Sequence, residues 1–230
     1  KVSLATVKRN LSVIRSVWNF ASREHGINGL NPFSNMNYGN ASAAIRRLPI
    51  PSADIQTVQM ECQAIDDDIR WLIALISDTG LRLAEAAGLL KQDFIGLDTD
   101  QPYVHISKYP WRNLKTASSA RLVPLCGQAL WAAKSIVATE NNTDYAFPRY
   151  NRKPITAANS ASALLNKWLK QYVPAGCTMH SFRHSMRDRL RTVGCPSDVI
   201  DQIGGWAVQS IGQMYGNGHA LYDLEEWLKQ

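Results

Sequence analysis

One short segment of the sequence, HSFRHSMR, places histidines and arginines at helical spacing. Residues three and four positions apart share a face of an α-helix, so one predicted face carries His180, Arg183, His184 and Arg187. The apolar residues fall on another face, the ordinary core-facing side of such a helix: Phe182, Met186, Leu190 and Val193. Imidazoles and guanidiniums gain nothing from one another's company, so we expect an anion opposite the basic face.

The basic face has two other interpretations. A metal site is one, because two histidines four residues apart on a helix can bind zinc. The fixed charge of Arg183 between His180 and His184 would repel a cation, and the glutamate of the zinc motif HExxH is missing, so we expect no metal here. A solvated polar face is the other interpretation, and the segment by itself leaves it open.

A second arginine stands in DTGLRLAEAAGL, where a new helix is predicted to begin after Gly80. A cation at a helix N-terminus is unfavourable beside the helix dipole, so Arg82 needs a partner there. Glu85, one turn on, can pair with it and hold its guanidinium, although a plain surface ion pair is the simpler interpretation. Arg82 and Arg183, on separate helices, could together bind one phosphate by forked contacts that lysine cannot make.

Composition places the chain among basic globular proteins. Its 230 residues are 45% hydrophobic and carry a formal charge of +6, which favours a polyanionic partner without requiring one. The four cysteines form no CxxC pair, which disfavours a zinc ribbon and fits a reducing compartment. With no apolar run of about 18 residues and no signal peptide, we expect a cytoplasmic protein without a membrane partner. The first residue is Lys1 rather than methionine, so we expect that residues upstream are missing.

Two units are predicted along the chain. A helical pattern runs from Ser3 to about Glu24, and a linker rich in Asn, Ser and Pro follows it. We place the boundary near Pro49, which gives an N-terminal unit over residues 1–48 and a main unit over residues 49–230.

The main unit is predicted to be mostly helical with a small antiparallel sheet, an α+β fold. QPYVHIS and ARLVPL have the pattern of two strands joined by a long polar loop, a hairpin. Ser52 can cap the first helix of the unit, and Gly80 can end the second. The segments expected to be helical are 53–65, 66–79, 82–90, 127–140, 156–173, 179–194, 196–204, 207–216 and 219–230.

Several of these segments resemble the sequence boxes of the tyrosine recombinase, or phage integrase, family. TGLRLAEAAGL resembles its first arginine box, LKTASSARLVPL its lysine hairpin, and HSFRH followed by GGW and MYG its second box. The boxes occur in the family's order over about residues 50–220. The resemblance implies the catalytic fold of this family, a DNA breaking and rejoining enzyme. It also implies that residues 1–48 are the end of its N-terminal core-binding domain.

The resemblance gives a role to each matching residue. Arg82 and Arg183 would bind the scissile phosphate, and His180 would be an acid–base and hydrogen-bonding partner. Tyr215 would be the nucleophile. A phenol with a pKa near 10 is mostly protonated at neutral pH, so Tyr215 needs a base or the positive field of the arginines.

The remaining matches are the lysine and three supporting positions. Lys115 fits best as the residue that protonates the departing 5′ oxygen, and Lys108 is the rival. Where the family usually has a histidine, about nine residues before the tyrosine, this chain has Trp206, as some members do. An indole N–H can donate a hydrogen bond to phosphate but cannot shuttle a proton. His184 and Glu85 would support the site without touching phosphate.

The implied reaction cuts and rejoins DNA through a covalent link. The tyrosine oxygen attacks a phosphodiester and leaves a 3′-phosphotyrosyl ester and a free 5′-hydroxyl, and reversal by another 5′-hydroxyl joins strands without ATP. The resemblance implies no cofactor and no metal. We expect a site-specific recombinase or integrase that integrates or excises a mobile element. The alternatives are a type IB topoisomerase-like enzyme and a non-catalytic DNA-binding accessory protein.

Double-stranded DNA is the expected partner, with no small-molecule substrate, and binding should weaken as salt rises. The basic residues expected to contact the DNA backbone are Arg46, Arg47, Lys108, Arg112, Arg121 and Arg187. The tail HALYDLEEWLKQ has an apolar face that can close over its own unit or dock on a neighbouring protomer. Exchange of tails would give a homo-oligomer, a tetramer on paired DNA sites.

Overall fold

The structure is a computed structural model that describes residues 2–37, 48–152, 154–206 and 218–230. The chain divides into two units, Lys1–Arg46 and Arg47–Gln230. The second unit holds every sequence box that carries the family resemblance.

The first unit is built on one long helix, α1 (Leu4–His25). The helix begins after Ser3, whose side chain accepts a hydrogen bond from the backbone N–H of Thr6. It ends at Gly26, which has the left-handed conformation (φ 61°) that glycine adopts without strain. The helix predicted from the sequence in this region is therefore confirmed.

The segment after α1 returns along the helix. Asn31 donates a hydrogen bond to the backbone oxygen of Arg15 at 3.2 Å, and the rings of Trp18 and Phe33 meet edge to face with centroids 6.5 Å apart. No residue of α1 is buried among the described residues, and Phe20 is 66% exposed. The described part of this unit therefore has little core of its own.

The second unit is mostly helical where the structure describes it. Its helices are α2 (Ser52–Ile65), α3 (Asp68–Thr79), α4 (Leu83–Ala87), α5 (Gly127–Ala138), α6 (Ala158–Leu169), α7 (Ser181–Thr192), α8 (Ser197–Gly204) and α9 (Leu221–Lys229). Short 3₁₀ turns lie at η1 (Lys91–Asp93), η2 (Ala117–Ser119) and η3 (Pro148–Tyr150). The predicted helices are confirmed apart from their ends, and the one expected over 207–216 lies outside the described residues.

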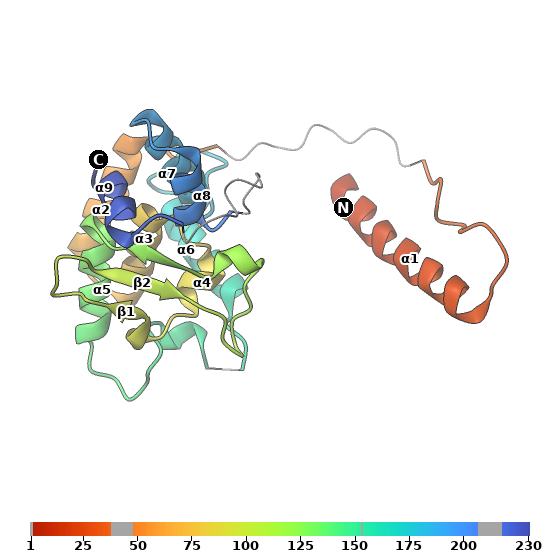
Figure 1. Ribbon diagram of the computed structural model, residues 1–230, viewed down its shortest axis with the longest axis horizontal. Helices are drawn as coiled ribbons and strands as arrows, with labels where there is room; N and C mark the ends of the chain where they lie inside the picture. The colour runs from red at the N-terminus through yellow and green to blue at the C-terminus, as the bar shows by residue number, and fades with distance from the viewer. Residues whose placement is uncertain (1, 38–47, 153, 207–217) are drawn as a thin grey trace. The chain divides into compact units, whose positions relative to one another are not determined.

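The predicted hairpin is present, within an antiparallel sheet of order β1-β2-β3. Strand β2 (Tyr103–Ile106) pairs with β3 (Arg121–Pro124), and β1 (Phe94–Ile95) pairs with the other edge of β2. In Figure 1 the strands cross one side of the second unit, with helices around and behind them. The sequence did not predict β1, because two residues are too few for an alternating pattern. The α+β expectation is confirmed.

Helix α3 forms the centre of the core. Seven of its residues between Leu72 and Thr79 are buried, and the helix packs against α5, α2 and α7. It ends at Gly80, which is left-handed (φ 60°) and so close to α7 that an added Cβ would lie 2.7 Å from the side chain of Met186. This tight turn therefore brings the segment with Arg82 close to α7, the helix that carries Arg183.

Helix α9 closes over its own unit. Leu224 is 1% exposed, the helix packs against β3, and the thiol of Cys126 donates a hydrogen bond to the backbone oxygen of Leu228 at 3.5 Å. Of the two arrangements expected for the tail, the single chain therefore has the one in which the tail covers its own unit.

Two local expectations were wrong. Ser52 does not cap α2, because Pro51 occupies the position before the helix and makes no side-chain cap. Val193 is 38% exposed and follows the end of α7, so the apolar face of that helix consists of Phe182, Met186 and Leu190.

Candidate active site

Arg82 lies where the chain turns from α3 into α4. Its guanidinium is 2.5 Å from a carboxylate oxygen of Glu85, and its backbone N–H donates to the other oxygen at 3.1 Å. The predicted ion pair between these residues is therefore present. The side chain of Arg82 is 21% exposed, so this guanidinium is paired with Glu85 and still reaches solvent.

Glu85 is almost completely buried and is shared by two arginines. Its second oxygen lies 3.1 Å from the guanidinium of Arg121, on strand β3. Burial opposes the charge on this carboxylate, but Arg121 and the hydrogen bonds from Arg82 outweigh it and hold the pKa of Glu85 below its ordinary value. Glu85 is therefore an ionised residue inside the protein that holds two arginines, and its pair with Arg82 is not the plain surface ion pair that the sequence also allowed.

Arg183, on α7, is 3% exposed. It donates to the backbone oxygen of Gly80 at 3.0 Å and to that of Gly204, and it forms no ion pair with any described carboxylate. Burial, then the charges of Arg82 and Arg121, lower the pKa of Arg183 to about 9, which still leaves it charged at neutral pH.

We call Arg82, Arg121, Arg183 and Glu85 the arginine cluster. Three guanidiniums face one carboxylate, which leaves a surplus of positive charge in a largely buried place. A charge buried without a counter-ion is unfavourable, so an anion bound at this point would stabilise the cluster. The anion that the sequence predicted opposite the basic face fits here.

Trp206 lies against the cluster. Its ring is 4.0 Å from the guanidinium carbon of Arg183 and 4.6 Å from that of Arg187, contacts in the range of cation–π interactions. The ring also lies over Gly204, where an added Cβ would be 1.7 Å from a ring carbon. Arg183 and Arg187 thus share a face of α7, as predicted.

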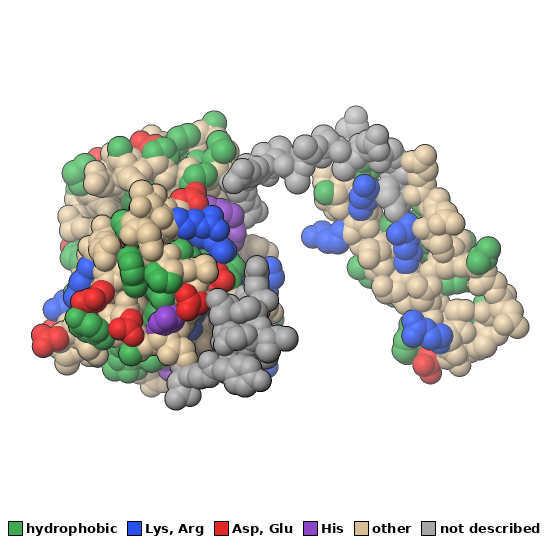
Figure 2. All heavy atoms as spheres, turned by 45° about the horizontal axis from the view of Figure 1, so that its top comes forward, with side chains coloured by type: hydrophobic (Ala, Val, Ile, Leu, Met, Phe, Trp, Pro, Cys, Tyr) green, Lys and Arg blue, Asp and Glu red, His purple; other side chains and the backbone are tan. Residues whose placement is uncertain are grey.

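The two histidines of the predicted face are exposed. His180 immediately precedes α7, and its ring meets that of His184 edge to face with centroids 5.2 Å apart. Figure 2 shows histidine and basic side chains side by side on one face of the second unit.

The loop of the hairpin reaches the arginine cluster through hydroxyl groups. Ser119, in η2, accepts a hydrogen bond from the guanidinium of Arg82 at 3.0 Å, and its hydroxyl lies 2.9 Å from that of Thr116. Lys115 directly precedes Thr116 and is exposed, as is Lys108 at the other end of the loop. The order of contacts places Lys115 nearer to Arg82 along the bonded network than Lys108.

A sequence model of the phage integrase family matches residues 52–220, most of the chain and all of the site described here. The chain belongs to the phage integrase family. It is therefore a tyrosine-type site-specific DNA recombinase, as predicted from the sequence boxes.

Solved structures of integrases and recombinases share the fold. The Tn1549 transposon integrase in complex with a circular intermediate DNA has a TM-score of 0.66 and 18% identity, over 98% of this chain and 78% of that one. The XerA recombinase has a TM-score of 0.55 and 14% identity, over 99% and 76%. The integrase of mycobacterium phage Brujita has a TM-score of 0.54 and 13% identity, over 100% and 72%. No curated protein matches the sequence.

In this member of the phage integrase family, two of the predicted DNA contacts are structural instead. Arg112 is 2% exposed and donates to the backbone oxygens of Glu85 and Ser107. Arg121 is 9% exposed and all three of its nitrogens bind protein atoms. Both guanidiniums are thus bonded to protein atoms in this structure. Strand periodicity is the signal that identifies Arg121, because it points to the same face as the buried Val123.

The roles predicted for several other residues remain predictions. Arg187 is half-buried and pairs with Asp201 at 3.1 Å, so part of its charge is already neutralised. Arg46, Arg47 and Tyr215 lie outside the described residues. Sequence reasoning missed Ser119, since a serine in a polar loop carries no pattern that marks it as a partner of Arg82.

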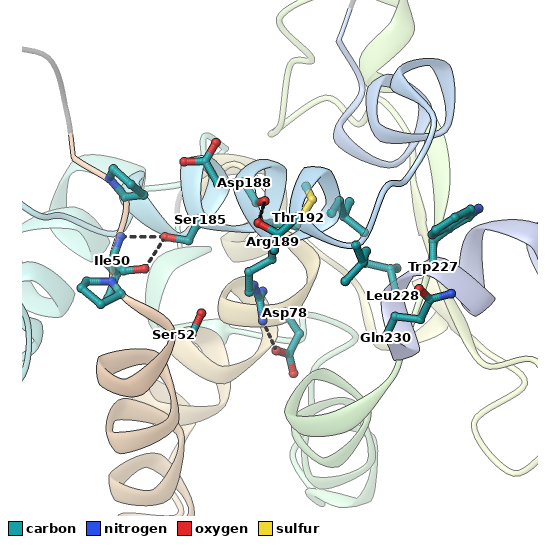
Figure 3. Close-up of a pocket in the computed structure, with 15 residues that line it drawn as sticks. Ile50, Ser52, Asp78, Ser185, Asp188, Arg189, Thr192, Trp227, Leu228 and Gln230 are labelled. Carbon is teal, nitrogen blue, oxygen red and sulfur yellow. Dashed lines mark hydrogen bonds and ion pairs between the residues drawn. The ribbon is translucent and has the colours of Figure 1, made fainter.

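A separate pocket of about 460 Å³ lies between α7, α9 and the start of α2. Figure 3 shows Ser185 bonded to the backbone of Ile50 on one side and Arg189 paired with Asp78 on another. No residue predicted for the active site lines this pocket.

Among the described residues, no group of three or more His, Cys, Asp or Glu side chains is placed to hold a metal ion. None of the described helices is long and apolar enough to cross a membrane.

Proposed function

We propose that this chain cuts and rejoins double-stranded DNA through a 3′-phosphotyrosyl intermediate at Tyr215. The observation that carries the proposal is the surplus positive charge of the arginine cluster, which suits a phosphodiester. Arg82 is the part-exposed guanidinium and would meet the phosphate directly. Arg183 would bind it beside the ring of Trp206, whose indole N–H would supply a further donor.

The proposed step conserves the number of phosphate ester bonds. The phenol oxygen of Tyr215 attacks phosphorus, the bond from phosphorus to the 5′ oxygen breaks, and the proton of the phenol passes to His180. Lys115 donates a proton to the departing 5′ oxygen. A free 5′-hydroxyl can then attack the phosphotyrosine and reverse the sequence, so neither water nor ATP is consumed.

The hydroxyl network supports Lys115 over Lys108 as the acid. Thr116 and Ser119 connect the residue after Lys115 to the guanidinium of Arg82. On the other side of the loop, the phenol of Tyr109, next to Lys108, is bonded to Asp93. The Lys115 end of the loop is thus bonded to the guanidinium of Arg82 itself, whereas Ser107, next to Lys108, is linked through Arg112 only to the backbone of Glu85.

We further propose that the enzyme integrates or excises a mobile element and works as a homo-oligomer on paired DNA sites. The family and the fold shared with a transposon integrase and a phage integrase support the first part. The apolar face of α9 supports the second, since a helix that closes over its own unit can dock in the same way on a neighbour. Residues 1–48 would belong to the DNA-binding domain and residues 49–230 to the catalytic domain.

The covalent intermediate can be trapped. A duplex from the ends of the element, nicked close to the cut, releases a short 5′-hydroxyl strand on cleavage, so that rejoining is prevented. We expect a protein–DNA adduct on a denaturing gel, absent in Tyr215→Phe and present in Tyr222→Phe, which changes an exposed tyrosine of α9.

Binding of the same duplex by Tyr215→Phe should persist. Failure of the unmodified chain to form an adduct on any element end would contradict the proposal. Relaxation of supercoiled DNA without joining between two marked duplexes would replace recombination by topoisomerase activity.

A further inference from the structure

The turn Ile203–Gly205 at the end of α8, which we call the carbonyl turn, is where the arginines of the cluster meet. Arg121 donates to the backbone oxygen of Ile203 at 2.7 Å, Arg183 to that of Gly204, and Arg82 to that of Gly205 at 3.3 Å. Three consecutive carbonyls therefore accept from three separate elements of the fold.

These carbonyls are the ones that the helix cannot satisfy. The oxygen of Asp201 already accepts from Trp206, and that of Gln202 accepts from Gly205. The last carbonyls of any helix have no partner within it and carry the negative end of its dipole. The guanidiniums thus complete the end of α8, and the end of α8 in turn fixes where the guanidiniums lie.

Arg121 differs from the other two arginines in how completely the protein uses it. Its side chain is 4% exposed, and it donates to the oxygen of Ile203, to that of Ser119 at 2.7 Å and to Glu85 at 3.1 Å. Glu85 and Ser119 are also the side chains that hold Arg82. Arg121 is therefore bonded to both supports of Arg82 and to the turn that accepts from Arg183.

The turn is shaped to admit this arginine. Gly205 is left-handed (φ 62°), and a Cβ added there would lie 2.8 Å from a terminal nitrogen of Arg121. A side chain at position 205 would therefore push the guanidinium away from the turn as well as strain the backbone.

We propose that Arg121 is a positioning residue for the phosphate site: it contacts no DNA, and it holds Glu85, Ser119 and the carbonyl turn in the arrangement that places Arg82 and Arg183. This inference rests on the proposed function. A lysine cannot replace the arginine, because a single ammonium does not span three acceptors in the plane of a guanidinium.

The test compares Arg121→Met and Arg121→Lys with Arg70→Met in the full chain. Arg70 is a suitable control, since it too is an arginine with a mostly buried side chain. It stacks on Trp168 and pairs with Asp67 at the start of α3, the opposite end of that helix from the turn that leads to Arg82. Circular dichroism and thermal melting first establish the temperature at which each variant is folded, and all assays are run below it.

The measurement is the single-turnover rate of adduct formation at saturating DNA. A misplacement of about 1 Å at a reacting group costs on the order of 100-fold in rate, so we expect a fall of about that size in Arg121→Met and a smaller fall in Arg121→Lys. Arg70→Met should react at the wild-type rate. A wild-type rate in folded Arg121→Met would overturn the inference.

Two further readouts separate positioning from other roles. A phosphate contact contributes about one unit to the slope of log affinity against log salt, so an unchanged slope in Arg121→Met is expected, and a slope reduced by about one unit would make Arg121 a DNA contact. Removal of Arg121 also takes away the largest effect that lowers the pKa of Glu85. Cleavage by the variant should therefore fail at a higher pH than wild type as the solution is acidified, and an unshifted acid limb would argue against positioning through Glu85.

The unmodified chain separates this inference from the proposed function. If the unmodified chain forms no adduct, the proposed function fails and the inference falls with it. If the unmodified chain forms the adduct and the Arg121 variants match it, the inference alone is wrong.

Discussion

Glu85 is the residue on which the arginine cluster depends. Its two oxygens bind Arg82 and Arg121, it is 2% exposed, and no other carboxylate of the described residues forms an ion pair with either guanidinium. The exposed ion pair between Lys134 and Asp98 is the opposite case, since Asp98 is 93% exposed and water screens its charge.

Glu85→Gln should therefore be strongly destabilising. Loss of one partner from a buried charge network costs about 3 kcal/mol, so we expect that decrease in the free energy of unfolding at pH 7, measured by chemical denaturation. Asp98→Asn is the control and should change the stability by less than about 0.5 kcal/mol. A loss no larger than that of the control would show that Glu85 is not a structural anion.

The effect of Glu85→Gln should also depend on pH. The cluster lowers the pKa of Glu85 in the folded state, so its ionised form stabilises the protein fully above the ordinary pKa of about 4.3. This contribution is lost as the pH falls through the lowered folded-state value. The difference between wild type and variant should thus be complete at pH 7 and shrink below about pH 4.

Among the elements, helices were predictable and the hydrogen-bonded turns were not. The apolar run of α3 predicted that helix, and Gly80 predicted its end. The pairing of Arg82 with Glu85 followed from their spacing. The buried position of Arg112 did not, since an arginine in a polar loop looks the same whether it faces solvent or a carbonyl. For Arg121 the period of β3 indicates the buried face but not the partners that the guanidinium binds there. The bond from Arg121 to Ile203 depends on α8 and β3 meeting, which no local pattern encodes.

The hairpin loop offers a test of which lysine acts as the acid. In a substrate with sulfur in place of the 5′ bridging oxygen, the leaving thiolate needs no proton. General acids contribute about 100-fold or more, so Lys115→Ala should slow cleavage of the ordinary ester by at least that factor and recover on the sulfur substrate. Lys108→Ala should cleave the two substrates with the wild-type ratio of rates. Recovery in Lys108→Ala instead would exchange the two assignments.

At the scale of the whole molecule, the second unit is closed by its own C-terminal helix. Leu224 of α9 is buried and the helix packs on β3, the strand that carries Arg121. The tail is thus part of the same core as the site. Its release to a neighbour would remove packing from β3, the strand that carries Arg121 of the cluster.

Leu224→Ala should lower the free energy of unfolding by about 3 kcal/mol, the usual cost of truncating a buried leucine. Tyr222→Ala, on the exposed side of the same helix, is the control and should have a small effect. Thermal melting of the unmodified chain should be independent of protein concentration if α9 stays on its own unit in solution. A melting temperature that rises with concentration would indicate exchanged tails.

The ring of Trp206 fills the space that a side chain at position 204 would need. These two positions are therefore coupled in evolution, because a side chain at 204 requires the indole at 206 to move away or to be replaced by a smaller ring. A switch from indole to imidazole at 206 would leave more room at this point, so it favours a later loss of Gly204 in the descendants of this sequence.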